Sequence, residues 1–290
     1  MAKMIDYIRL LRPWQWYKNL LIAVPLVFGY KLFEINSYPK IITGFISLCL
    51  ASSAVYVIND IKDVEKDRHH PIKKQRPLAS GNVKIHSAFM ISISLVVASL
   101  FTSLFLTRNI PFTTTVFIFL VNSLLYTTYF KNKPIADIVI ISINYIIRSS
   151  SGAILLNIYV SPWLILGTFF LAMIILIGKR ISEIKRLQNK APNHRPVYKY
   201  YTREFLEKMF NITAGILILT YAIYCTEHPY KSHYLPLTLP IAFYSIFRYL
   251  YLIETNYEMG EEPHKLVKDI PLLLSNTLWL FSVILILYYI

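Results

Sequence analysis

Three aspartates recur along one short charged segment, "NDIKDVEKDRHHPIKKQRPLASG". In a helix, Asp60, Asp63 and Asp67 would fall within about a 60° arc of one face. Carboxylates this close repel each other, and a divalent cation relieves that repulsion. Because Mg²⁺ favours carboxylate oxygens, water and substrate phosphates, the spacing predicts a Mg²⁺ site that binds a diphosphate. The adjacent His69 and His70 are interpreted as solvated interface residues, since Mg²⁺ prefers oxygen ligands.

The residues around these aspartates fit the same chemistry. Asn59 stands beside the first carboxylate and could orient the metal-bound group, and Lys73 and Arg76 follow in a basic cluster suited to phosphate oxygens. The alternative is a solvated helix end in which Lys62 and Lys66 neutralise the aspartates along the helix.

A second group of ionisable residues lies in "YTTYFKNKPIADIVIISINYIIRSSSG". Lys131 stands in an expected loop, Asp137 enters the next apolar stretch, and Arg148 lies about three turns deeper, about 20° around the helix from Asp137. Ionisable residues inside a membrane are costly and mark functional sites by default. The alternative is a buried structural ion pair. The tyrosines that could line a cavity here are Tyr126, Tyr129 and Tyr145.

A third group is "GKRISEIKR". Lys179 and Arg180 could contact phosphates, and Glu183 could contact a metal or a ribose. Read alone, the stretch is ordinary cytoplasmic positive charge. Arg248 is a weaker candidate, because it could snorkel or pair with Glu254.

The elements that must position these residues are apolar helices. Of the 290 residues, 55% are hydrophobic and only 16% are charged, and the mean hydropathy is +0.47. A soluble domain carries about 25% charged residues, whereas stretches of about 20 apolar residues span a bilayer. The sequence therefore predicts an all-α, polytopic membrane protein of about nine transmembrane helices. The expected spans are 15–33, 41–59, 86–107, 111–129, 136–157, 161–178, 207–226, 234–253 and 270–290.

The distribution of positive charge predicts the orientation of these spans. With the N-terminus in the cytoplasm, most of the 30 lysines and arginines fall on the cytoplasmic side, and long loops are expected at 60–85 and 179–206. The opposite side carries Lys31, Lys40, Arg108 and Lys231. This asymmetry explains most of the net charge of +14 without a nucleic-acid partner. No cleavable signal peptide is evident, so the first span is expected to remain. Two cysteines, Cys49 and Cys225, are expected to be buried.

These motifs together resemble the UbiA superfamily of intramembrane prenyltransferases. The resemblance rests on the pattern NDxxDxxxD at 59–67, the tail HPxKxxRPxASG at 70–81, and the stretch from Tyr126 to Lys131 with Pro134 and Asp137. It implies one transmembrane domain over residues 1–290, a helix bundle around a central cavity, and Mg²⁺ held by Asp60, Asp63 and Asp67 as the catalytic residues.

The chain departs from most members of that superfamily after the sixth span. They carry a second aspartate-rich motif there, and this sequence has Lys179-Arg180-x-x-Glu183 instead. Together with "RPWQWYKN" at 12–19, this looks like the decaprenyl-phosphate phosphoribosyltransferase branch, whose members move 5-phosphoribose from phosphoribosyl diphosphate (PRPP) to a polyprenyl phosphate. The resemblance implies a plasma-membrane enzyme. The substrate contacts expected are Lys18, Asn59, Lys73, Arg76, Tyr126, Lys131, Asp137, Arg148, Lys179, Arg180 and Glu183.

Two other functions stay open at this point. One is a prenyl-diphosphate transferase that acts on an aromatic or other small acceptor, against which the missing second motif counts. The other is a transporter or lipid-binding protein, which would explain the spans but gives no reason for the aspartate face. A homo-oligomer is compatible with the sequence.

Overall fold

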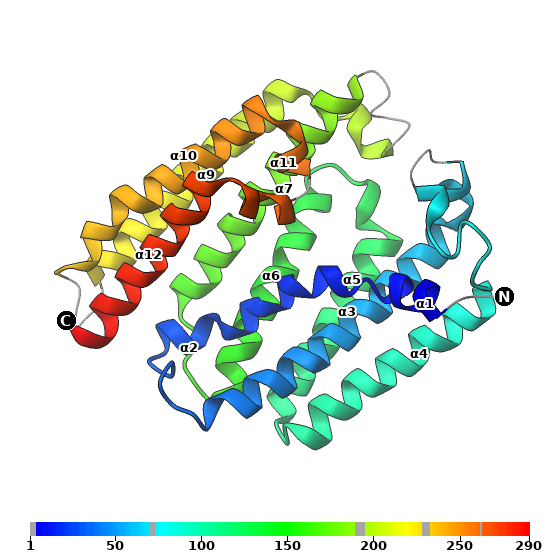
Figure 1. The fold of residues 1–290 in the computed structure, drawn as a ribbon, viewed down its shortest axis with the longest axis horizontal. Helices are drawn as coiled ribbons and strands as arrows, with labels where there is room; N and C mark the ends of the chain where they lie inside the picture. Colours follow the sequence, from blue (N-terminus) through cyan, green and yellow to red (C-terminus); the bar gives the residue numbers. More distant parts are fainter. Residues whose placement is uncertain (1–3, 70–72, 189–194, 228–232, 262) are drawn as a thin grey trace. The chain divides into compact units, whose positions relative to one another are not determined.

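The computed structural model describes residues 4–69, 73–188, 195–227, 233–261 and 263–290. Every regular element among these residues is a helix, which confirms the all-α prediction. The chain divides into two compact units (Figure 1): Met1–Tyr129 with Ile147–Val160, and Phe130–Ile146 with Ser161–Ile290. The single domain expected over residues 1–290 stays a prediction.

Within the described residues, eight helices are long and apolar enough to cross a membrane. They match all the expected spans but the first, and most begin or end within a few residues of the expected positions. The chain is therefore a multi-pass membrane protein. The eight spans are Ser37–Arg68, Ile85–Leu106, Ile110–Thr128, Ala136–Leu155, Pro162–Leu187, Arg203–Glu227, Leu235–Thr255 and Ile270–Tyr289.

The expected span 15–33 is built differently. It consists of a 3-10 helix, Pro13–Ala23, followed by the short helix α2, Val24–Phe28. Pro25 explains why no long α-helix runs through this stretch, because its ring clashes with the carbonyl four residues earlier and it has no amide hydrogen to donate. Sequence hydropathy does not detect this interruption, since the residues around it are apolar.

In the first unit, α3 (Ser37–Arg68) contacts most of the other elements. It packs on α1 (Met4–Leu11), the 3-10 helix, α4 (Ile85–Phe101) and α5 (Ile110–Thr128). Small side chains on α3 are buried, namely Ser47, Ala51, Ser52, Ser53 and Ala54. Small residues let membrane helices approach closely, where apolar bulk alone provides little driving force.

One close contact fixes the 3-10 helix in the first unit. A Cβ built on Gly152, in α6 (Ala136–Leu155), would overlap the backbone carbonyl oxygen of Ile22. The displaced atom belongs to the backbone, so a side-chain rotation cannot relieve the overlap. Only glycine therefore fits at this position.

The second unit is arranged around α7 (Pro162–Leu187). This helix contacts α9 (Arg203–Glu227), α10 (Leu239–Thr255) and α11 (Tyr257–Glu261), and α10 contacts α12 (Ile270–Tyr289). The buried core includes Ile174, Ile177, Phe210, Tyr249 and Ile253.

The candidate pairing of Arg248 with Glu254 is wrong. Arg248 instead donates to both carboxylate oxygens of Asp269, at 3.1 Å and 2.8 Å. These hydrogen bonds lower the pKa of Asp269, whose carboxylate also accepts from the amide of Leu272 at the start of α12. Arg248 therefore ties the middle of α10 to the N-cap residue of α12.

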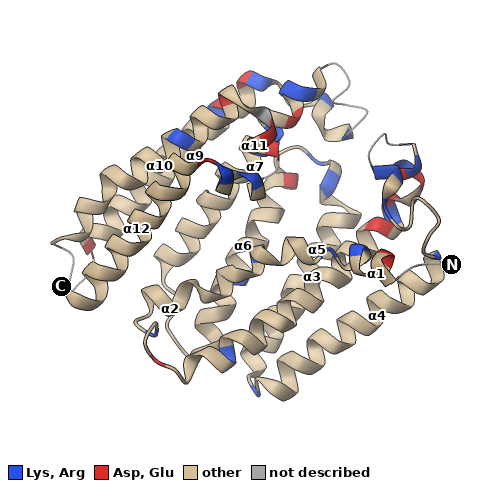
Figure 2. Cartoon of the chain, viewed as in Figure 1, with Lys and Arg blue, Asp and Glu red and all other residues tan. Residues whose placement is uncertain are grey.

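Charged residues are concentrated at particular helix ends (Figure 2). In the first unit they gather at the C-terminal end of α3 and in the segment after it. In the second unit they gather at the C-terminal end of α7, at α11 and at the beginning of α9.

Gly152→Ala should lower the thermal stability of the protein. The added methyl group would push the 3-10 helix away from α6, at a cost of about 1–3 kcal/mol. Gly167→Ala is the matched control, because a Cβ there meets nothing within 4 Å. Melting temperatures of the two variants in the same detergent provide the measurement. Equal melting temperatures would show that the contact with Ile22 is not tight.

Candidate functional site

The aspartates of the first unit lie on a continuous helix. The helix α3 continues to Arg68 and therefore carries Asp60, Asp63 and Asp67. The sequence had predicted a loop from residue 60 onward. Asp60 and Asp67 are each 3% exposed, and Asp63 is partly buried. The shared helical face expected from the spacing is thus present, and two of its carboxylates are withdrawn from water.

Arginines neutralise two of these carboxylates, Asp60 and Asp67. Arg12 donates to Asp60 Oδ1. Arg76 Nη1 donates to Asp60 Oδ1 at 3.1 Å and to Asp67 Oδ2 at 2.6 Å. Lys62 instead donates to two backbone carbonyls at the end of α5, at 2.8 Å and 3.0 Å. The solvated helix end considered from the sequence therefore does not describe Asp60 and Asp67, which are buried and paired with arginines.

Sequence reasoning did not assign Arg12 to the site. Its backbone is left-handed, with φ 53°, and its guanidinium lies 5.5 Å from the ring centroid of Tyr56. The segment around it is tied to α3, because Trp16 Nε1 donates to Ser53 and Ser53 donates to the carbonyl of Leu11. The one signal in the sequence was the motif "RPWQWYKN", which begins at this arginine.

The donor set on α3 fits Mg²⁺. Asp60 and Asp67 both contact one guanidinium nitrogen of Arg76, so these two carboxylates are close enough to share a cation. Mg²⁺ commonly takes one or two carboxylates and completes its shell with water and substrate phosphates. Among the described residues, no three or more His, Cys, Asp or Glu side chains are grouped closely enough to hold a metal. Arg76 thus brings Asp60 and Asp67 together, and the metal site expected from all three aspartates stays a prediction.

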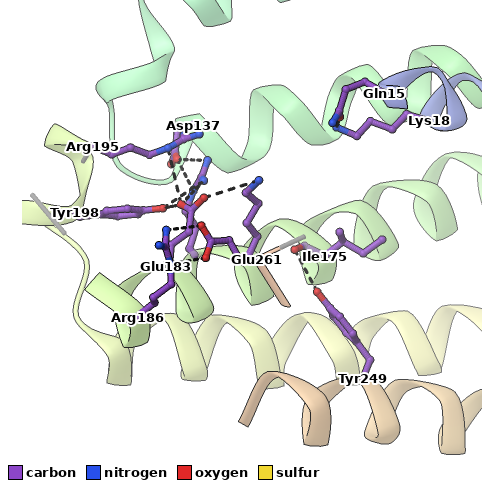
Figure 3. A network of polar contacts seen from close by, with 12 residues as sticks. Gln15, Lys18, Asp137, Ile175, Glu183, Arg186, Arg195, Tyr198, Tyr249 and Glu261 are labelled. Carbon is purple, nitrogen blue, oxygen red and sulfur yellow. Dashed lines mark hydrogen bonds and ion pairs between the residues drawn. The ribbon is translucent and has the colours of Figure 1, made fainter. Parts of the chain in front are cut away.

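The structure divides the other expected site residues between the two units. Lys73 begins a 3-10 turn three residues before Arg76, and Lys18 donates to Gln15 at 2.7 Å (Figure 3). Those in the first unit are Lys18, Asn59, Lys73, Arg76, Tyr126 and Arg148. Those in the second unit are Lys131, Asp137, Lys179, Arg180 and Glu183. His70 lies outside the described residues. The ring of His69 contacts the backbone carbonyl of Glu65 at 2.9 Å and makes no hydrogen bond to a side chain among the described residues.

Arg148 is buried in the first unit, with 5% exposed. Its Nε donates to Asn19 Oδ1 at 2.8 Å, and its guanidinium lies 4.6 Å from the ring centroid of Phe119. Asn19 also accepts from Ser52 and donates to Cys49. Arg148 therefore holds the 3-10 helix through Asn19, a partner that the sequence analysis did not identify.

A buried acid–base network occupies the second unit (Figure 3). Arg180 is 1% exposed; its Nε donates to Asp137 Oδ2 at 3.1 Å and its Nη1 to Glu183 Oε2 at 3.3 Å. Tyr198 donates to Glu183, and Tyr201 donates to Asp137 at 2.6 Å. Asp137 and Arg180 thus form a buried ion pair.

Two tyrosines complete this network. Tyr201 Oη also accepts from the amide of Ile135 at 2.6 Å, so it bridges the start of α6 and the segment before α9. Burial raises the pKa of Tyr201, and its hydrogen bond to Asp137 raises it further. The hydroxyl therefore stays protonated and remains a donor. Sequence reasoning missed Tyr198 and Tyr201, because tyrosine is common in this chain and neither stands in a motif.

Comparison with known proteins is consistent with these features. Residues 20–264 match the model of the UbiA prenyltransferase family. The chain is 29% identical over 282 residues to a decaprenyl-phosphate phosphoribosyltransferase of Mycobacterium tuberculosis, covering 95% of this chain and 92% of the relative. It is 33% identical over 221 residues to the protein of that name from Mycolicibacterium smegmatis, covering 75% and 69%.

A solved structure has the same fold. A UbiA homologue from Archaeoglobus fulgidus, bound to GPP and Mg²⁺, superimposes with a TM-score of 0.75. The two chains are 20% identical, and the match covers 97% of this chain and 99% of the homologue.

Arg12→Gly should destabilise the protein, because the buried Asp60 carboxylate would lose one of its two arginine partners. Glycine adopts the left-handed backbone freely, so the variant removes the guanidinium without adding strain. The expected loss is about 1–3 kcal/mol, because a buried charge loses a partner. Unfolding in detergent measures it.

The double variant Arg12→Gly with Asp60→Asn is the control. It removes the charge that needs the guanidinium, so part of the lost stability should return. If the second substitution adds its own full cost instead, the contact between Arg12 and Asp60 does not contribute to stability.

Proposed function

Because this chain belongs to the UbiA prenyltransferase family, we propose that it transfers 5-phosphoribose from PRPP to a polyprenyl phosphate and releases diphosphate. The observation that carries this proposal is the stretch Lys179-Arg180-x-x-Glu183, where cations stand at the position of a second aspartate motif. Similarity to decaprenyl-phosphate phosphoribosyltransferases over most of both chains supports the same donor and acceptor.

The charges of the substrates support this choice over a prenyl diphosphate. A prenyl diphosphate carries charge only on its diphosphate, and an aromatic acceptor adds little or none. PRPP carries a 5-phosphate as well, and the polyprenyl phosphate brings another. A cation such as Lys179 suits these additional phosphates, whereas an aspartate at the same place would repel them.

Asp60 and Asp67, with Asp63 beside them, are the residues that would hold Mg²⁺, and Asn59 would orient the bound diphosphate. When bound, Mg²⁺ neutralises the diphosphate and so makes it a better leaving group. Arg76 is suited to the same anion, since both of its carboxylate contacts use Nη1 and leave Nε and Nη2 for phosphate oxygens. Lys73 is the second cation proposed for the diphosphate.

The remaining expected contacts keep proposed roles in binding substrate. We assign Lys179 to a phosphate, and Arg180 to the positioning of Glu183 beside it. The other proposed contacts are Lys18, Tyr126, Lys131, Asp137 and Arg148.

The reaction breaks the bond between C1 of the ribose and the diphosphate oxygen. A phosphate oxygen of the polyprenyl phosphate forms the new bond to C1 from the opposite side, so the configuration at C1 inverts. The acceptor is already an anion at neutral pH, and no general base is required. Positive charge develops on the ribose in the transition state, and the cations that stabilise the departing diphosphate lower the barrier.

The positive-inside bias supports a cytoplasmic location for the N-terminus and for the charged ends of α3 and α7, where PRPP and Mg²⁺ are present. We therefore propose a multi-pass protein of the plasma membrane. Its polyprenyl substrate would keep its chain in the lipid, because burying each methylene contributes about 0.8 kcal/mol.

Purified protein with Mg²⁺, PRPP and a polyprenyl phosphate should form a phosphoribosyl lipid and release diphosphate. Mass spectrometry of the lipid and a diphosphate assay provide the measurement. Product from a prenyl diphosphate and an aromatic acid, with none from PRPP, would replace this function by prenyl transfer. No product in either assay would favour a transporter or lipid-binding protein.

Asp67→Asn should reduce the rate at least about a hundredfold, since it removes a metal-binding charge at almost constant shape. Glu65→Gln is the control on the same helix. Glu65 is exposed and pairs with Arg68 at 2.6 Å, so its loss should leave the rate unchanged. A fully active Asp67→Asn variant would refute the metal-binding role of this face.

A further inference from the structure

The acid–base network of the second unit holds more cations than carboxylates. Arg180 contacts both Asp137 and Glu183. Two further cations approach the same glutamate, one at each oxygen: Lys179 Nζ lies 3.8 Å from Oε1, and Arg195 Nε lies 3.9 Å from Oε2. Three cations therefore approach the two carboxylates of this network.

Other acidic residues of this unit are already engaged with other cations. Glu254 is contacted by Lys185 and Arg203, at 2.5 Å and 3.1 Å. Glu261 is contacted by Arg186 at 2.6 Å. Within the network, Lys179 and Arg195 are the more exposed cations, at 33% and 23%, whereas Arg180 is 1% exposed.

Arg195 has an unused donor. Its Nη1 is buried and has no hydrogen-bond partner among the residues that the structure describes. A buried donor without a partner is destabilising, and more so when it is charged. An anionic acceptor for this donor would remove that cost. An anion with several oxygens on one phosphorus atom fits a planar guanidinium best.

The segment that carries Arg195 is held in place by the network. The amide of Tyr198 donates to the carbonyl of Arg195 at 3.0 Å, and the side chain of Tyr198 donates to Glu183. Figure 3 shows Arg195, Tyr198 and Glu183 together beside Asp137. The guanidinium is therefore positioned before a ligand arrives, which limits the entropy lost on binding.

We propose that Arg195, together with Lys179, binds the phosphate monoester group of a substrate, with Glu183 as the positioning residue between the two cations. This inference rests on the proposed function and deepens it. A phosphate monoester is what PRPP and a polyprenyl phosphate both carry and what a prenyl diphosphate lacks. Arg195 would thus be a specificity-determining residue.

Calorimetric titration of the full-length protein in detergent with Mg²⁺ tests the proposal without turnover. The probes are ribose 5-phosphate, which has the monoester only, and inorganic diphosphate. Arg195→Gln should weaken ribose 5-phosphate at least about tenfold and change diphosphate less than about twofold. Lys199→Gln, in the same segment but exposed, is the charge-matched control and should change neither.

Steady-state kinetics identifies the source of the monoester. A raised KM for PRPP in Arg195→Gln assigns the group to the donor, and a raised KM for the polyprenyl phosphate assigns it to the acceptor. If both KM values and the binding of ribose 5-phosphate are unchanged, the proposal is wrong. It is also wrong if ribose 5-phosphate and diphosphate weaken equally, because that result reports a general loss of charge.

Folding is checked by the melting temperature of each variant. Arg195→Lys keeps the charge but loses the planar fork, and should recover part of the affinity. If Arg195→Gln does not fold, Lys179→Gln is titrated with the same probes and the same expected result. If the wild type transfers phosphoribose but none of these variants changes ribose 5-phosphate binding or KM, this inference alone is refuted. Arg195-dependent binding without phosphoribosyl transfer refutes the proposed function alone.

Discussion

Buried carboxylates impose the main electrostatic constraint on both units of this protein. Asp60 and Asp67 in the first unit, and Asp137 and Glu183 in the second, are almost completely withdrawn from water. An unpaired ion in such a place costs several kcal/mol, so each acid needs a cation held against it. Arginine meets this need because one planar group can donate to two acceptors at once.

The neutralising arginines also fix the backbone segments that carry them. Arg12 ties the chain before the 3-10 helix to α3, and Arg76 ties the segment after α3 back to the same face. Arg180 holds α7 to the start of α6 through Asp137. Each of these arginines therefore stabilises the fold and is also a candidate for binding anions. Loss of the arginine or of its carboxylate partner would disturb both roles.

The sequence predicted the long helices well, because apolar stretches of bilayer length are a strong signal. It failed at 15–33, where Pro25 interrupts an otherwise apolar run, and it ended the second span before the aspartates that α3 carries to Arg68. The aspartate face was predictable because helical periodicity relates residues that are near in sequence. Arg12 and Tyr201 were not, since their partners lie 48 and 64 residues away.

The sign of the local charge distinguishes the two candidate chemistries in the second unit. A second aspartate motif would gather negative charge and so attract Mg²⁺. Here Lys179, Arg180 and Arg195 approach the two carboxylates Asp137 and Glu183. A further divalent cation would meet repulsion in this network, whereas a phosphate would be attracted. The proposed function follows from this sign of charge, because bases in place of acids favour a donor or acceptor that carries an additional phosphate.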